Sequence, residues 1–264
     1  MFLKIDIMKQ HFALITGASS GIGFQYAREM ARRNYNLIVV SNVDEIYVKA
    51  EALCAEFPSV EVVPMVCDLG TSDAARILYD SCSEYEVEVL INNAGVYHDC
   101  DFIDDSEAFN KLILNLHINT PAMLVYYFAK DMADRGKGYI LNMSSITNRI
   151  AVQRLSTYAS TKAFLSSFTR SVHVELRYKG VSVTCVRPGA VDTGLFNISS
   201  FATKMGLLLG YIVKPEYLAH RAVKAMFRGC ADVTIPWFWN KLLMFLVALL
   251  PTCMLRLIRR WGIF

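Results

Sequence analysis

The sequence predicts an α/β protein with a doubly wound parallel sheet. Short apolar runs, each long enough for a buried strand, alternate with longer helical patterns over most of the chain. A glycine-rich turn follows the first run, and a turn of small polar residues follows the fourth. Strands that are joined through helices form right-handed crossovers, so they lie parallel in one sheet that helices cover on both faces.

The strands are predicted from runs that are apolar and bounded by glycine or polar residues. They cover residues 11–16, 36–41, 60–66, 89–92, 139–144 and 181–187, with a last edge strand at 232–235. Helices are predicted up to residue 33 after the glycine turn, and at 44–56, 71–84, 105–135 and 157–178. We expect Pro121 to interrupt the fourth helix, Gly180 to end the fifth and Pro215 to begin another.

The composition is that of one globular domain covering residues 1–264, because no linker, repeat or low-complexity tract divides the chain. Hydrophobic residues make up 54% and charged residues 19%, which is enough apolar material for a large core. The net charge of +3 is too small to indicate a nucleic-acid partner, and no basic run with interleaved aromatic residues suggests one.

The cysteines and histidines predict neither disulfides nor a metal site. Seven cysteines is an odd number, their spacing is irregular, and no CxxC motif occurs, which favours free thiols in a reducing compartment. The five histidines are scattered without the spacing of metal ligands. The first twelve residues include Asp6 and lack a long apolar run, so they do not resemble a signal peptide, and a cytoplasmic location is expected.

Two turns at the predicted strand ends are suited to a dinucleotide. Gly17, Gly21 and Gly23 separate the first strand from its helix, and glycines let the backbone approach a pyrophosphate at a helix N-terminus. Residues 92–95, Asn-Asn-Ala-Gly, end the fourth strand with small side chains, near the crevice where ligands bind. Asp68 follows the third strand and could accept a hydrogen bond from an adenine amino group or precede the next helix.

A tyrosine and a lysine share one face of the fifth predicted helix. Tyr158 and Lys162 are four residues apart, so their side chains are neighbours. A nearby ammonium favours the phenolate, and we therefore expect it to lower the pKa of Tyr158 from about 10 toward neutrality. Such a phenol can donate a proton to a carbonyl oxygen or accept one from an alcohol. An ordinary exposed pair would have the same spacing.

These motifs together resemble the short-chain dehydrogenase/reductase family, whose members carry a Tyr-x-x-x-Lys centre on a Rossmann-like fold. The matching stretches are TGASSGIG at 16–23, NNAG at 92–95, a serine thirteen residues before Tyr158, YASTK at 158–162 and RPGAVDT at 187–193. They stand in the order of the family, and the resemblance covers about residues 10–235, the core that precedes an apolar C-terminal extension.

The resemblance implies a role for each matching residue. Tyr158 would be the general acid or base, Lys162 would lower its pKa and bind the nicotinamide ribose, and Ser145 would polarise the substrate carbonyl. Strand alternation would send Ser144 to the opposite face. The implied cofactor-binding residues are Gly17, Ser19, Ser20, Gly21, Ile22, Gly23, Ser41, Asn42, Asp68, Asn93, Ala94, Gly95, Tyr158, Lys162, Pro188, Gly189, Val191 and Thr193.

The chain departs from the family in the helix before the fifth strand. The family places an asparagine there, which kinks the helix and holds a water molecule for proton relay. The corresponding residue is His117, flanked by Asn115 and Asn119. A histidine could hold the same water and relay protons as a fourth catalytic residue, or it could simply be packed inside the helix. Either asparagine could also take the role.

The identity of the nicotinamide cofactor depends on the residues after the second strand. NAD-preferring members carry an acid at the position of Ser41, and many NADP-preferring members carry arginine at the position of Asn42. Without an acid to repel it, a 2′-phosphate can be bound by the hydroxyl and amide groups of these residues, which favours NADP(H). Asp44 would reverse this preference if its carboxylate turned toward the ribose.

Two segments near the C-terminus are apolar. Residues 194–214 correspond to the substrate lid of the family, and their leucine, methionine and phenylalanine side chains favour a lipophilic substrate. Residues 237–264 are apolar and basic, with no acid after Asp232. Asn240, Lys241 and Pro251 interrupt the apolar run before it reaches the length of a transmembrane helix. We expect a homo-oligomer contact or peripheral membrane contact for this segment.

The resemblance therefore predicts an NAD(P)-dependent oxidoreductase. It would transfer hydride between nicotinamide and a ketone or secondary alcohol, with a fatty or sterol-like carbonyl reduced by NADPH. The alternative is a member of the same fold that binds the dinucleotide, or a membrane, without turnover. The fold and motifs define the reaction but not the substrate.

Overall fold

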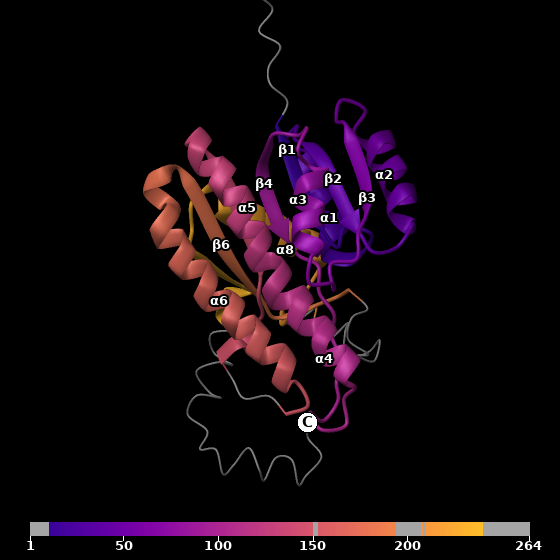
Figure 1. Ribbon diagram of the computed structural model, residues 1–264, viewed down its shortest axis with the longest axis vertical. Helices are drawn as coiled ribbons and strands as arrows, with labels where there is room; N and C mark the ends of the chain where they lie inside the picture. The colour runs from indigo at the N-terminus through magenta and orange to yellow at the C-terminus, as the bar shows by residue number, and fades with distance from the viewer. Residues whose placement is uncertain (1–10, 150–152, 194–206, 208–209, 240–264) are drawn as a thin grey trace, which may run out of the picture.

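The computed structural model describes residues 11–149, 153–193, 207 and 210–239 (Figure 1). A seven-stranded sheet has the order β3-β2-β1-β4-β5-β6-β9, and every neighbouring pair is parallel. The predicted doubly wound α/β fold is confirmed. The strands are β1 Phe12–Thr16, β2 Asn36–Ser41, β3 Val62–Val66, β4 Val87–Asn92, β5 Gly138–Met143, β6 Val181–Pro188 and β9 Asp232–Ile235.

Helices cover both faces of this sheet. Those on one face are α1 (Gly21–Ala31), α2 (Glu45–Glu56) and α8 (Pro215–Phe227), and those on the other are α3 (Ala74–Ser81), α5 (Thr120–Arg135) and α6 (Ser156–Leu176). The shorter helix α4 (Glu107–Leu114) precedes α5. The carboxyl ends of the strands point toward the lower half of Figure 1, where α4 and the start of α6 lie.

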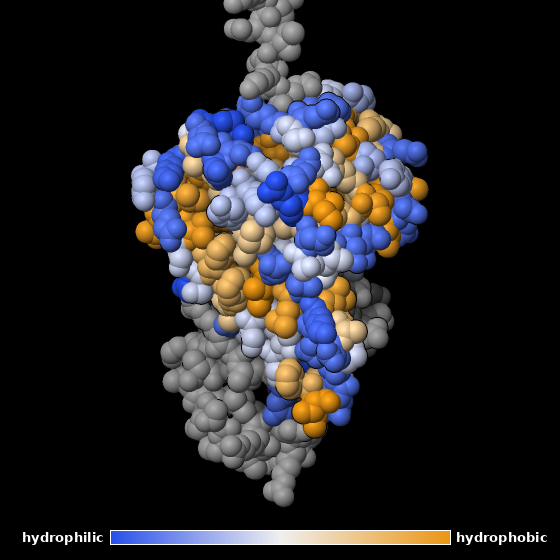
Figure 2. All heavy atoms as spheres, in the orientation of Figure 1, coloured by the Kyte–Doolittle hydropathy of each residue, from blue (hydrophilic) through white to orange (hydrophobic). Residues whose placement is uncertain are grey.

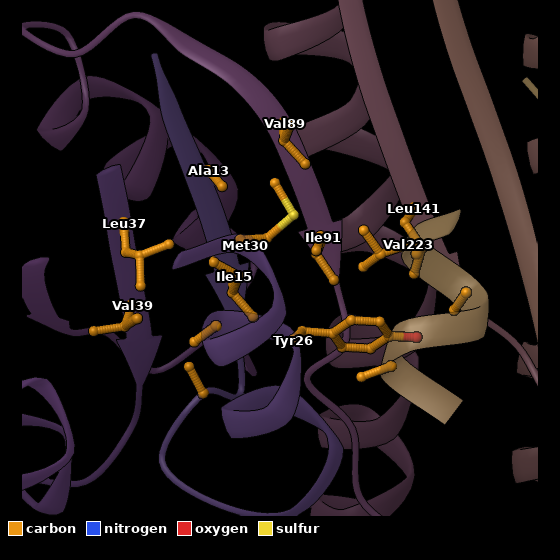
Figure 3. Packing of buried hydrophobic residues seen from close by; sticks show 14 of the residues in the cluster. Ala13, Ile15, Tyr26, Met30, Leu37, Val39, Val89, Ile91, Leu141 and Val223 are labelled. Carbon is orange, nitrogen blue, oxygen red and sulfur yellow. The ribbon is translucent and has the colours of Figure 1, made fainter. Parts of the chain in front are cut away.

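Each face has its own hydrophobic cluster. Strand residues such as Ile15 and Ile91 are fully buried because both faces of a parallel sheet are covered. Figure 3 shows Tyr26 reaching from α1 past Ile91 toward α8, and its hydroxyl donates to Met143 Sδ at 3.0 Å. This packing fixes α1, whose N-terminus follows the glycine turn, against the centre of the sheet.

The helix before β5 contains a π-helical turn. Residues Asn115–Asn119 form this turn between α4 and α5, and Pro121 lies in the first turn of α5. A proline inside a helix donates no hydrogen bond and crowds the carbonyl four residues earlier, which here is that of His117. Widening the preceding turn relieves that conflict. The predicted interruption therefore lies just before the proline, at the residue that departs from the family.

Short and irregular elements differ most from the prediction. Two-residue strands β7 (Ala190–Val191) and β8 (Ile212–Val213) form a separate small sheet, and they are too short to produce a sequence pattern. Single 3-10 turns occur at Ile146–Arg149 and Arg177–Lys179, and Gly180 ends the second of them in a left-handed conformation. Most of the predicted lid, residues 194–206 and 208–209, lies outside the described residues, as do residues 240–264 of the extension.

One described helical stretch is long and apolar enough to cross a membrane by composition alone. It is the continuous helix Glu107–Arg135, of which 44% of the most apolar window is buried in the protein. The buried residues of α5 belong to the core that covers one face of the sheet. Packing in the core thus accounts for part of its apolar character.

Candidate active site

The glycine turn forms a cradle because Gly17 and Gly23 have no side chain to occupy it. Gly17 has φ +66°, and a Cβ on it would lie 2.9 Å from the Cα of Ala94. A Cβ on Gly23 would overlap the carbonyl oxygen of Gly17. Ser20, at the N-cap of α1, makes no side-chain capping bond, so the first-turn N–H groups are available to an anion. These features fit the pyrophosphate of a dinucleotide.

Hydrogen bonds join this turn to the end of β4. Thr16 Oγ1 accepts from the backbone N–H groups of Asn93 and Ala94, both at 3.0 Å. The Asn93 amide in turn donates to the carbonyl oxygens of Thr16 and Gly17, at 3.0 and 3.3 Å. The two small-residue turns that the sequence singles out therefore form one wall.

A cleft of about 460 Å³ opens along this wall. Among the sequence-predicted cofactor residues, its lining includes Gly17, Ser19, Ser20, Gly21, Ile22, Gly23, Ser41, Asn42, Asp68, Asn93, Ala94, Gly95 and Thr193. Ser41 is buried and its hydroxyl donates to Ser19 Oγ at 3.0 Å, whereas Asn42 is exposed. Asp68 Oδ1 accepts from Gly70 N at 2.9 Å. Asp44 is exposed and does not line the described cleft.

A smaller pocket of about 100 Å³ adjoins the cleft. It contains the remaining predicted residues, namely His117, Ser145, Tyr158, Lys162, Pro188, Gly189 and Val191, and it shares Ile22, Asn93, Gly95, Val96 and Thr193 with the cleft. The described structure thus brings the predicted catalytic and cofactor-binding residues together at the carboxyl ends of the strands, where α/β sheets bind ligands.

Ser145 and Tyr158 line the same pocket, and the Ser145 side chain acts to lower the pKa of Tyr158. Thr147 donates to Ser145 Oγ twice, from its backbone N at 3.2 Å and its hydroxyl at 3.0 Å, so the serine keeps its own proton to donate. The hydroxyl of Ser144 instead donates to Lys162 O at 2.7 Å, on the helix that carries Tyr158. Both serines line the pocket, but the two hydroxyls have different partners, since Ser144 donates to α6 and Ser145 accepts from Thr147.

The expected lowering of the Tyr158 pKa is not what this arrangement produces. Burial raises the pKa of Tyr158 to about 12, and the hydrogen bond from Ser145 only partly opposes this. Burial also lowers the pKa of Lys162 to about 8. The Lys162 ammonium donates to Met143 O at 2.9 Å and lies 5.6 Å from the centre of the Tyr158 ring. Removal of both groups from water outweighs their mutual attraction.

His117 is buried beside the catalytic residues, with a contact on each ring nitrogen. Its Nε2 accepts from Val96 N at 3.0 Å, and its Nδ1 lies 3.1 Å from Thr161 Oγ1. Its ring packs edgewise on Tyr158 with centroids 5.7 Å apart. Asn115 and Asn119, the alternative residues, instead donate to Gly70 O and Ser72 O, at 2.8 and 3.0 Å. His117 is therefore the residue that the fold places at the site.

Comparison with known proteins agrees with this geometry. A profile of the family described as short chain dehydrogenase matches residues 11–203. The chain belongs to the short-chain dehydrogenase family. The profile is that of a dehydrogenase, and the glycine cradle with its adjoining cleft fits a dinucleotide.

Relatives of this short-chain dehydrogenase include a protein named as a reductase and a protein named as inactive. It is 32% identical over 191 residues to very-long-chain 3-oxoacyl-CoA reductase-B of Danio rerio, covering 71% of this chain and 61% of that protein. It is 28% identical over 251 residues to inactive hydroxysteroid dehydrogenase-like protein 1 of Homo sapiens, covering 93% of this chain and 74% of the other. The chain thus spans about three fifths of the length of the first relative.

Solved structures have the same fold. A short-chain dehydrogenase from Sphingobium yanoikuyae in complex with NADPH superposes with a TM-score of 0.77 at 26% identity, covering 88% of this chain and 92% of that one. A bulky-bulky ketone specific alcohol dehydrogenase from Comamonas testosteroni gives the same TM-score and identity, covering 92% and 96%.

Several residues of the short-chain dehydrogenase site were not predicted from the sequence. The Tyr97 ring meets the Tyr158 ring edge-on, with centroids 5.5 Å apart. The hydroxyl of Thr16 accepts from Ala94 N next to the glycine turn. The hydroxyl of Thr161 contacts His117. Thr16 and Thr161 lie inside the TGASSGIG and YASTK motifs, and Tyr97 is two residues after the NNAG motif. This position in or near a motif was the available signal, because their partners are distant in sequence.

Proposed function

We propose that this short-chain dehydrogenase reduces a lipophilic ketone with NADPH. The observation that carries the proposal is the meeting of Ser145, Tyr158 and Lys162 in one pocket, which shares lining residues with the dinucleotide cleft. These are the groups that carbonyl reduction requires: a positioned proton donor, a second hydroxyl for the oxygen, and a positive charge next to the donor.

Each side chain has a defined part in the step. Bound nicotinamide supplies a hydride to the carbonyl carbon. The hydroxyls of Ser145 and Tyr158 orient the carbonyl oxygen, and the proton of Tyr158 passes to that oxygen as the C–H bond forms. The phenolate that remains is stabilised by the Ser145 hydroxyl and by the charge of Lys162.

The pKa of Tyr158 favours the reductive direction. At about 12, the phenol is protonated at neutral pH and can act as an acid. Oxidation of an alcohol needs the phenolate as base, and this form is scarce until the solution is alkaline. Reduction is therefore the direction that this site supports near pH 7.

NADPH is proposed as the reductant because of the polar groups at the end of β2. Ser41 and Asn42 line the cleft with a hydroxyl and an amide, and Asp44 is not part of the described lining. A 2′-phosphate would therefore meet hydrogen-bonding groups and no nearby carboxylate from this turn. The Sphingobium yanoikuyae structure, which contains NADPH, supports the same choice.

A lipophilic substrate is proposed from the pocket and the relatives. Val96, Met143 and Val191 give the described part of the pocket an apolar lining. Two similar proteins are named for a very-long-chain 3-oxoacyl-CoA and for bulky ketones. We propose that residues 194–214 cover this substrate as a lid.

The protein is proposed to be a cytoplasmic homo-oligomer. Leu114, Tyr126 and Phe164 expose much of their side chains on the face formed by α4, α5 and α6, where apolar residues gather in Figure 2. The Phe164 and Phe168 rings stack on the same face, 5.7 Å apart. Peripheral membrane contact through 237–264 is the second proposal, and exposed Trp237 and Trp239 at its start are suited to an interface.

The proposal is tested by following NADPH oxidation with bulky ketones and with 3-oxoacyl thioesters of increasing chain length. Tyr158→Phe should reduce turnover by about 10²–10⁴-fold while NADPH binding, measured by fluorescence, persists. Tyr178→Phe is the matched control, because Tyr178 is 80% exposed just after α6. Equal turnover in Tyr158→Phe and wild type would overturn the assignment.

A non-catalytic dinucleotide-binding protein is the second candidate. Its support is the 28% identity to a human protein named as inactive, together with the histidine at position 117. The same measurements separate the two functions. Saturable NADPH binding without turnover of any carbonyl in the series would favour the binding protein, whereas Tyr158-dependent turnover would exclude it.

A further inference from the structure

Three side chains with metal-binding groups meet in the loop between β4 and α4. His98, Cys100 and Asp105 place one nitrogen, one sulfur and one oxygen atom within 4.8 Å of one another. His98 Nδ1 lies 3.2 Å from Asp105 Oδ1. Their sequence spacing matches no common metal motif, so the sequence predicted no metal site. The fold nevertheless brings the three groups together.

The loop that carries these groups is held in place from several sides. Arg154 Nε donates to Asp99 Oδ1 at 2.6 Å, and Arg154 O accepts from Cys100 N at 3.2 Å. Asp105 Oδ1 also accepts from Ser106 N at 2.8 Å, at the start of α4. The His98 ring packs edgewise on Phe109, with centroids 5.0 Å apart. Groups supported in this way lose little freedom when they bind an ion.

We propose that His98, Cys100 and Asp105 bind a zinc ion. Sulfur and imidazole nitrogen select zinc over magnesium or calcium, and a carboxylate oxygen is an accepted third ligand. Zinc–nitrogen and zinc–oxygen bonds of about 2.0–2.1 Å set two ligand atoms of a tetrahedron about 3.3 Å apart. The 3.2 Å between His98 Nδ1 and Asp105 Oδ1 already matches this edge. Three protein ligands leave the fourth position open for water.

Besides Asp99, which pairs with Arg154, the loop carries three carboxylates, those of Asp101, Asp104 and Asp105, which attract a divalent cation.

The zinc site adjoins the substrate pocket. A small cavity is lined by the three ligands and, on its other side, by Ser156, Thr157 and Tyr158. His98 directly follows Tyr97, whose ring contacts Tyr158. A bound ion would therefore fix the loop that borders the catalytic tyrosine. The site does not depend on the proposed reaction, because no step of that reaction uses it.

Cobalt(II) provides a direct test on the full chain after treatment with a chelator. Titration should give one equivalent of bound Co²⁺ with visible bands of tetrahedral geometry and an ultraviolet thiolate-to-cobalt band, and one equivalent of Zn²⁺ should abolish both. Cys100→Ser should remove the thiolate band. His98→Gln and Asp105→Asn should each weaken binding by about tenfold or more, as loss of a ligand implies.

Matched variants separate this site from other thiols and imidazoles. Cys54→Ser and His220→Gln alter exposed residues on α2 and α8, and both should leave the cobalt spectrum and affinity unchanged. Unchanged NADPH binding and circular dichroism would show that the loop variants fold. A thiolate band that persists in Cys100→Ser, or wild-type affinity in both His98→Gln and Asp105→Asn, would overturn the proposal, as would the absence of cobalt binding.

Discussion

The hydroxyl of Thr161 lies 3.1 Å from His117 Nδ1 and donates its own proton to the carbonyl of Tyr158 at 2.8 Å. A hydroxyl has one proton to give, so its oxygen must accept from the imidazole. Because Nε2 accepts from Val96 N, His117 is held as the neutral ring protonated on Nδ1. With both nitrogens engaged, we interpret His117 as a positioning residue that fastens the loop after β4 to the turn carrying Tyr158.

His117 should make the protein sensitive to acid. Burial and the charge of Lys162 hold the pKa of His117 well below its usual 6.5. As the pH falls below 6.5, the unfolded chain binds a proton that the folded protein does not, so stability decreases by up to about 1.4 kcal/mol per pH unit. The urea midpoint of the wild type should therefore fall more between pH 7.5 and pH 5 than that of His117→Asn.

The same substitution at His220 is the control, since the side chain of His220 is 55% exposed on α8. His220→Asn should retain the wild-type pH dependence. If His117→Asn shows the same loss of stability in acid as the wild type, His117 is not the buried neutral group that we describe. At pH 7.5, His117→Asn should still cost about 1–3 kcal/mol if it leaves Val96 N or Thr161 without its partner.

Lys162 should set the upper pH limit of reduction. Its pKa of about 8 means that the ammonium is present below that pH and is lost above it. The phenolate left by proton transfer from Tyr158 then loses its stabilising charge. The kcat/KM of ketone reduction should be constant from pH 6 to 7 and should decline above about 8, with the phenol of Tyr158 still protonated.

Lys162→Arg tests the cause of that decline. Arginine keeps its charge above pH 12, so the variant, although slower, should show no fall in kcat/KM between pH 8 and about 9.5. If the kcat/KM of Lys162→Arg declined at the same pH as that of the wild type, another group would be responsible for the decline. A flat wild-type profile through the same range would mean that the lysine charge is not required.

The sequence was sufficient for the regular part of the fold. Strand β2 and the edge strand β9 coincide with the predicted ranges, because an apolar run bounded by polar residues is a local signal. Strand β4 begins two residues earlier than predicted, at Val87, because Glu88 interrupts the apolar run. The buried Glu88 carboxylate is reached by the hydroxyl of Tyr35 and the ammonium of Lys137, two partners that are distant in sequence.

The site was predictable in its members but not in its energetics. The glycine turn and the Tyr158–Lys162 pair were found because each motif is local. The raised pKa of Tyr158 was missed because spacing reports a neighbouring charge, whereas burial depends on every element packed around the ring. The cluster at His98 was missed for the same reason. Its loop is held at Asp99 by Arg154, which lies 55 residues later in the sequence.

Gly17 and Gly136 allow two effects of a glycine substitution to be measured separately. One is backbone strain at positive φ, and the other is the clash of a new Cβ with a neighbouring atom. Both have φ near +70°, yet a Cβ on Gly136 meets no atom within 4 Å, whereas one on Gly17 lies 2.9 Å from Ala94 Cα. Gly136→Ala should cost about 1 kcal/mol of stability, with unchanged NADPH affinity. Gly17→Ala should cost more and should weaken NADPH binding by about tenfold or more, since the turn must move away from Ala94. Equal NADPH affinities in the two variants would show that the turn is not part of the binding site.

Asn42 provides a charge test of the cofactor preference. Its side chain is exposed in the cleft beside Ser41, so a charged replacement carries no burial cost. Asn42→Arg should pair with a 2′-phosphate, and an exposed pair contributes about 0.2–1 kcal/mol, or up to about fivefold in affinity. Asn42→Asp should weaken NADPH binding by a similar factor through repulsion. The affinity for NADH, which lacks the phosphate, should change little with either variant.

The fluorescence titrations should be run at low salt, where exposed charges are least screened. Opposite shifts for NADPH with a constant NADH affinity would place the phosphate at Asn42. Parallel shifts for both cofactors would mean that the residue acts on the adenosine as a whole, and the proposed NADPH preference would then lose its structural basis.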